Sequence, residues 1–180
     1  MEIATEKALA LRHRKGFRGT SSWSMSWHAC LAARMGKAEK AREYINYLAE
    51  SMLMENYLPS HNDWREGTRF CFGDKIFQID AIFGITAAIC EMLIYSDDNA
   101  ITLLPTLPVN FQKGGFVKGL CGYGGTTFDV EWKNGEIINI KITAKKEVNF
   151  TLKTGMPVKN GDFNATGTQI SLRENQTVIF

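Results

Sequence analysis

The chain has 180 residues, of which 44% are hydrophobic and 22% charged, and its formal net charge is +2. These values are ordinary for a soluble globular protein with one large domain or two small ones. The net charge is too small to indicate a nucleic acid or an anionic membrane surface as a partner, and no apolar run approaches the roughly 20 residues that span a bilayer. The four cysteines and three histidines lack metal-type spacing, so we expect neither a metal ion nor a cofactor.

The first half of the chain predicts helices of two kinds. Residues 1–14 have a helical pattern that a glycine ends, and residues 38–55 have one apolar stripe opposite a charged face. Residues 23–35 and 81–95 are apolar on nearly every side, which is typical of helices that are buried all round. Alternating inner and outer helices favour an α/α toroid over a four-helix bundle, in which every helix would be amphipathic.

A long loop, residues 56–76, separates the helix predicted at 38–55 from the helix predicted at 81–95. Irregular loops of this length inside a compact domain are uncommon and are usually functional or disordered. Trp64, Phe70 and Phe72 argue against disorder. The loop also carries several charged residues, so we expect it to form a wall for a polar ligand.

From residue 99 onward the hydrophobic period changes to two. Residues 101–108, with two prolines, predict an extended connector, and the strands that follow are predicted at 116–120, 127–132, 137–143, 148–152, 170–172 and 178–180. Asn134-Gly135 is a strong hairpin signal between two of them. Short strands at this spacing predict an antiparallel β-sandwich over residues 99–180, after a helical domain over residues 1–98.

Asp80 stands where the long loop runs into the helix predicted at residues 81–95. One interpretation is a helix N-cap, whose carboxylate accepts hydrogen bonds from the first backbone N–H groups. The other is a catalytic carboxylate that the positive end of the helix dipole keeps ionised. Local sequence alone favours the cap, because Asp is among the commonest N-cap residues.

Several motifs, in the right order, resemble segments of one enzyme family. Residues 19–27 read GTSSWSMSW, residues 77–84 read FQIDAIFG, residues 101–108 read ITLLPTLP, and residues 130–132 read VEW. The first three resemble the G-T-G-W-S-x-x-W, F-Q-I-D-G/A-N-F-G and I-x-L-L-P-A-L-P segments of glycoside hydrolase family 95. Residues 130–132 continue the resemblance into the β domain of that family. That family contains α-L-fucosidases and related α-L-galactosidases.

The resemblance implies an α+β multidomain architecture. The family has an (α/α)6 toroid flanked by β-sandwich domains, and this sequence is similar to the last toroid helices followed by the C-terminal β-sandwich. The aspartate of F-Q-I-D is the family's general base in an inverting hydrolysis, so that role falls on Asp80. The family's general acid and water-positioning asparagines lie in upstream segments that this sequence does not contain. We therefore expect a fragment that is inactive alone, with a fucosylated glycan and the missing N-terminal part of the polypeptide as its partners.

Three further residues are candidates for substrate binding. Trp23 is expected either to pack in the core or, with Trp27, to form an aromatic floor for a sugar ring. Gln78 is expected to hydrogen-bond a sugar hydroxyl or to cap the loop. Asp74 stands near the place of a family histidine, and Ile82 replaces a family asparagine, so the sugar that is recognised stays open.

Two other functions remain alternatives. The β-sandwich could be a non-catalytic carbohydrate-binding or structural module, with Asp80 as a cap only. A phosphorylase of another toroid family has less support, because no glycine-rich loop precedes a helix to cradle phosphate.

Residues 1–18 are charged throughout and predict no signal peptide in this chain, whereas full-length members of the family are expected to be secreted or periplasmic.

Overall fold

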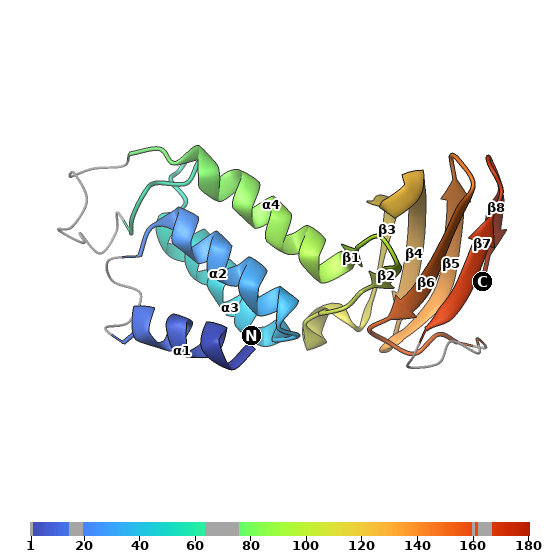
Figure 1. The fold of residues 1–180 in the computed structure, drawn as a ribbon. Helices are drawn as coiled ribbons and strands as arrows, with labels where there is room; N and C mark the ends of the chain where they lie inside the picture. The colour runs from blue at the N-terminus through green and yellow to red at the C-terminus, as the bar shows by residue number, and fades with distance from the viewer. Residues whose placement is uncertain (1, 15–19, 64–75, 160, 162–166) are drawn as a thin grey trace. The chain divides into compact units, whose positions relative to one another are not determined.

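The computed structural model describes residues 2–14, 20–63, 76–159, 161 and 167–180. It divides into two compact units, Met1–Ile89 and Cys90–Phe180, and Figure 1 shows helices first and strands after them, as the sequence predicts. None of the helices in these ranges is long and apolar enough to cross a membrane.

The first unit is helical. It contains α1 (Glu2–Arg12), α2 (Ser22–Arg34), α3 (Ala38–Tyr47), the π-helical turn η1 (Leu48–Met52) and most of α4 (Ile79–Leu93). Ser21 caps α2 by accepting a hydrogen bond from the Ser24 backbone N–H at 3.2 Å, and Gly36, with φ of 71°, follows its last turn. Met25 of α2 and Tyr44 of α3 are fully buried, so these two helices build the centre of the unit.

The prediction that two helices are buried all round is wrong for the described part of this chain. In α2 the rings of Trp23 and Trp27 are 46% and 37% exposed. In α4 the side chains of Ile79, Phe83 and Ile89 are exposed. Composition measures how apolar a helix is, but burial also needs a neighbour on each side, and the described elements cover only part of these two helices.

The chain after η1 folds back and brings α4 to the start of α2. Pro59 and Ser60 form β-bridges with Leu53 and Phe77, and the Gln78 backbone N–H donates to the Pro59 carbonyl at 2.9 Å. The Ser22 backbone N–H donates to the His61 carbonyl, also at 2.9 Å. The part of the predicted loop that the structure describes is therefore tied to the first turns of both α2 and α4.

The second unit is a two-sheet sandwich. Its strands are β1 (Ile94–Ser96), β2 (Ala100–Leu103), β3 (Gly114–Gly122), β4 (Thr126–Lys133), β5 (Glu136–Ala144), β6 (Val148–Thr154), β7 (Thr168–Leu172) and β8 (Thr177–Ile179). One sheet has the order β1-β2-β6-β7 and the other β3-β4-β5-β8. Apolar side chains from both sheets enclose the core, in which the rings of Phe128 and Phe150 meet edge to face at 6.1 Å between centroids. Asn134 and Gly135 both have positive φ, 55° and 80°, which confirms the predicted β4–β5 hairpin.

Two details of the β-region differ from the prediction. Residues 94 and 95, expected to end a helix, belong to β1, and residues 101–103 of the expected connector belong to β2. Strands β2 and β6 pair in parallel, whereas the other named strands pair antiparallel. A parallel pair needs a long crossover, and the chain provides one because it builds β3, β4 and β5 of the other sheet between β2 and β6.

Candidate functional site

Asp80 lies in the first turn of α4, which begins at Ile79, so it is inside the helix rather than at the N-cap position. Its side chain is exposed, and it makes no hydrogen bond or ion pair with any residue that the structure describes. The first turn of a helix favours a negative charge. This position therefore offers an accessible carboxylate whose oxygens are not used to hold the fold together.

Gln78 joins the beginnings of α4 and α2. Its Oε1 atom accepts a hydrogen bond from the Ser22 hydroxyl and another from the Trp23 backbone N–H, each at 2.8 Å. The N–H groups in the first turn of a helix lack intrahelical acceptors, so Gln78 caps α2 rather than its own loop. Its Nε2 atom has no hydrogen-bond partner within the described residues.

Trp23 and Trp27 form a stacked pair on α2. Their ring planes differ by 4° and their centroids lie 6.1 Å apart, while the guanidinium carbon of Arg12 lies 5.3 Å from the Trp27 centroid. Because both rings are partly exposed, the expectation that they pack in the core is wrong for the part of the chain described. The exposed surface of these two rings, next to the capped first turn of α2, is suited to contact the apolar face of a sugar ring.

Helices α2 and α4 lie close together at Gly84. A Cβ atom added there would lie 2.2 Å from the Ser26 hydroxyl oxygen, and the Cys30 thiol donates to the Gly84 carbonyl at 3.7 Å. Ser26 is itself buried and donates to the Trp23 carbonyl at 2.9 Å. Only a residue without a side chain allows this contact, which fixes α4 against the helix that carries the tryptophans.

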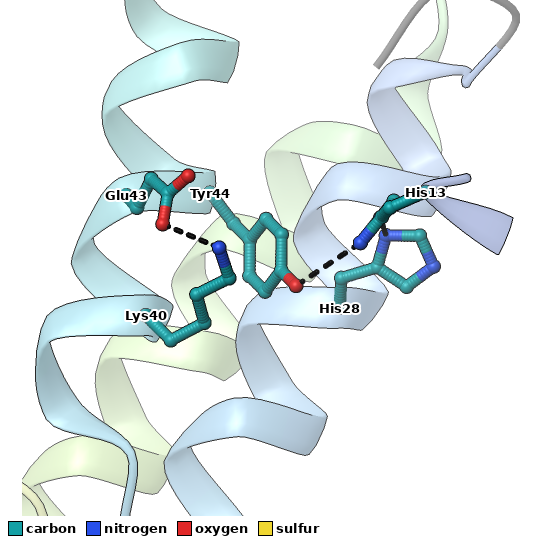
Figure 2. Close-up of polar contacts among 5 residues, drawn as sticks. All are labelled: His13, His28, Lys40, Glu43 and Tyr44. Carbon is teal, nitrogen blue, oxygen red and sulfur yellow. Dashed lines mark hydrogen bonds and ion pairs between the residues drawn. The ribbon is translucent and has the colours of Figure 1, made fainter. Parts of the chain in front are cut away.

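A second polar cluster joins the end of α1 to α2 and α3 (Figure 2). His13 Nε2 lies 3.0 Å from His28 Nδ1, and the Tyr44 hydroxyl lies 3.3 Å from His13 Nδ1. His28 is 1% exposed, and its Nε2 atom is buried without a hydrogen-bond partner among the described residues. Either ring can be the donor in the hydrogen bond between His13 Nε2 and His28 Nδ1, because the direction depends on the tautomer of each imidazole.

Burial keeps this cluster uncharged. Desolvation, and then the neighbouring His13 and Arg12, lower the pKa of His28 to about 4. Desolvation also lowers the pKa of His13, with Lys40 as the next cause, and raises the pKa of the Tyr44 hydroxyl to about 12, with a further contribution from Glu43. The cluster was not predicted from sequence, because its members come from three helices and have no motif spacing.

The remaining predicted site residue, Asp74, lies outside the described residues, as do Trp64, Phe70 and Phe72 of the same loop. The structure therefore brings together Gln78, Trp23 and the start of α4, and gives no account of Asp74. Among the residues described, no group of three or more His, Cys, Asp or Glu side chains is arranged to hold a metal ion.

Comparison with known proteins assigns both the helical and the strand region of the chain to one family. Residues 2–93 match the glycosyl hydrolase family 95 catalytic domain, and residues 95–180 match the glycoside hydrolase family 95 C-terminal domain. Alpha-L-fucosidase 2 of Arabidopsis thaliana is 31% identical over 151 residues, which cover 81% of this chain and 16% of that protein. Probable alpha-fucosidase A of Aspergillus oryzae is 27% identical over 136 residues, or 69% of this chain and 18% of that protein. The chain spans less than a fifth of each relative's length, and it belongs to glycoside hydrolase family 95.

Proposed function

We propose that this chain supplies the general base, Asp80, for inverting hydrolysis of α-L-fucosyl or α-L-galactosyl glycans. The observation that carries the proposal is the exposed carboxylate in the first turn of α4, without a partner among the described residues. A general base must reach a water molecule and be ionised before it can accept a proton, and an ion pair would occupy the oxygens that must accept that proton.

The neighbours of Asp80 suit a sugar. The exposed ring of Trp23 offers a surface for a pyranose, and Gln78 Nε2 offers a donor for a hydroxyl while its oxygen holds α2. Asp74 completes the proposed substrate-binding set. The family match to a glycoside hydrolase, together with two relatives named as fucosidases, supports fucose or galactose as the sugar class.

We propose that the 180 residues alone do not hydrolyse glycans. Inversion needs a second carboxylate, typically about 6.5–9.5 Å from the base, to protonate the leaving oxygen. The resemblance places that acid upstream of these residues. The exposed apolar side chains of α4, including Ile79, Phe83 and Ile89, offer a surface that the N-terminal part of the same polypeptide would cover.

The first experiment measures fucose release from a fucosylated trisaccharide by the chain alone. The expected result is no turnover above the buffer control. Turnover that Asp80→Asn abolishes would overturn the proposed inactivity while supporting the base, and turnover that survives Asp80→Asn would overturn the base.

A second experiment tests the base directly, in a chimera in which this chain replaces the matching segment of the Arabidopsis relative. Asp80→Asn is expected to lower kcat by at least about a hundredfold, since general-base catalysis contributes about 10²–10⁴. Asp98→Asn, in the exposed turn after β1, is the matched control and should leave kcat unchanged. If both variants have the kcat of the parent chimera, Asp80 is not the base.

A further inference from the structure

The second unit has a polar cavity that the proposed reaction does not use. Its volume is about 690 Å³, within the usual range for a small-molecule site. Its walls come from the beginning of β6, the end of β7 and the turn into β8, and its polar lining consists of Glu147, Asn149, Ser171, Arg173, Glu174 and Gln176.

The strand part of the cavity is set by the sheet register. Asn149 of β6 pairs with Ser171 of β7, and both are exposed. Phe150 and Leu172, the next residue on each strand, are buried in the sandwich core. Because side chains alternate along a strand, Asn149 and Ser171 stand side by side on the outer face of the sheet.

The turn part of the cavity is held by its own hydrogen bonds. The Arg173 backbone N–H donates to Gln176 Oε1 at 2.9 Å, and the Gln176 backbone N–H donates to the Arg173 carbonyl at 3.1 Å. Asn175, between them, has a φ of 59°, a left-handed conformation that Asn adopts more readily than most residues. The Ala144 backbone N–H donates to the Gln176 carbonyl at 3.0 Å, which fastens the turn to β5. The backbone of the turn that lines the cavity is thus held by hydrogen bonds within the chain.

The side chains of the cavity indicate what it binds. The side chains of Asn149, Ser171 and Arg173 make no hydrogen bond within the described part of the chain, so their donors and acceptors are available. The lining contains two carboxylates, those of Glu147 and Glu174, and one guanidinium, that of Arg173. Lys145 and Lys146 directly precede Glu147 in the sequence. Charges of both signs are therefore mixed, which gives no strong preference for an anion or a cation.

We infer that this cavity binds one neutral sugar residue through adjacent hydroxyl groups. Each sugar hydroxyl both donates and accepts, and the lining places an amide, a hydroxyl, a guanidinium and two carboxylates around one space. The inference goes beyond the proposed hydrolysis and does not depend on it, since Asp80 belongs to the first unit and the cavity to the second. A free monosaccharide and a sugar unit within a glycan share this chemistry.

The test is an NMR titration of the ¹⁵N-labelled chain with L-fucose, L-galactose and a fucosylated trisaccharide. Because the described lining contains no aromatic ring, we expect weak binding, with a Kd on the order of 1 mM, and shifts of the amides of residues 147–149 and 171–176. Shifts of amides around Trp23 and Gln78 report the proposed substrate site and are followed separately. Shifts with the free sugars point to a monosaccharide, and shifts with the trisaccharide alone point to a glycan.

Variants separate the cavity from the rest of the chain. Asn149→Ala and Arg173→Ala should each raise Kd by about tenfold, the effect of one lost hydrogen bond of average to good strength. Lys153→Ala, farther along β6 and outside the lining, should leave Kd unchanged. The inference is overturned if no sugar shifts these amides at concentrations on the order of 100 mM, or if the shifts persist unchanged in both cavity variants.

Discussion

Acidification should destabilise the helical unit through His28. This imidazole is buried and neutral in the folded chain, with its pKa lowered from 6.5 to about 4. The unfolded chain binds the proton more readily, so the stability that neutral His28 contributes is fully present above pH 6.5. It is lost as the pH falls from 6.5 through about 4.

The size of the loss follows from the same two values. The difference between 6.5 and about 4, at about 1.4 kcal/mol per pKa unit, corresponds to a loss of about 3 kcal/mol in the free energy of unfolding. That is a large share of the roughly 5–15 kcal/mol that stabilises a typical domain. The described surroundings do not stabilise the charged form of His28. Arg12 and His13 both disfavour it, and the buried Nε2 atom of His28 has no hydrogen-bond acceptor among the described residues.

The assay is urea unfolding at pH 7 and pH 4, followed by NMR signals of α2 amides so that the helical unit is observed by itself. His28→Leu should remove about 3 kcal/mol of the difference in unfolding free energy between the two pH values. Ala41→Gly, at a buried α3 position, is the matched control and should lower stability by about 1 kcal/mol equally at both. Equal acid losses in the wild type and His28→Leu, or a His28 ring that titrates near 6.5, would refute the reasoning.

Two further changes test how α4 is attached to α2. Gln78→Ala removes the acceptor of two hydrogen bonds and should cost about 1–3 kcal/mol in urea unfolding, whereas Gln78→Glu keeps an acceptor oxygen at the positive end of α2 and should retain most of the stability. Equal losses in the two variants would contradict the capping role. Gly84→Ala forces a Cβ atom against Ser26 and should cost about 1–3 kcal/mol, and Ser26→Gly in the double variant should restore part of it; additive losses would show that this contact is not the cause.

The features that the sequence predicted well are local ones. The positions of α2, α3 and α4 follow from apolar periodicity. The β4–β5 hairpin follows from Asn134-Gly135, because few residue types other than Asn and Gly tolerate a positive φ at the central positions of a two-residue turn. The change from helix to strand near residue 94 was placed a few residues late. Ile94 and Tyr95 continue the apolar run of α4, and only their pairing with Leu103 and Thr102 makes them a strand.

The features that the sequence did not predict depend on distant partners. The parallel pairing of β2 with β6 is set by how the whole sandwich closes, and no residue within either strand encodes it. The contact of His13, His28 and Tyr44 requires three elements to be placed before any of these side chains meet. The exposure of Trp23 cannot be predicted locally either. The sequence of an apolar helix is the same whether or not another element packs against its outer side.

The motif at residues 77–84 acts as one unit because of helix geometry. Asp80 and Gly84 are four residues apart on α4 and therefore lie on the same face. Gly84 brings that face against Ser26 of α2, while Gln78, just before the helix, holds the beginning of α2 through the Trp23 backbone. The carboxylate and the exposed tryptophan ring are thus fixed by two contacts, one before Asp80 and one after it. The amide and the glycine of the motif thus each contact α2, whereas the acid between them has no hydrogen bond or ion pair with the described residues.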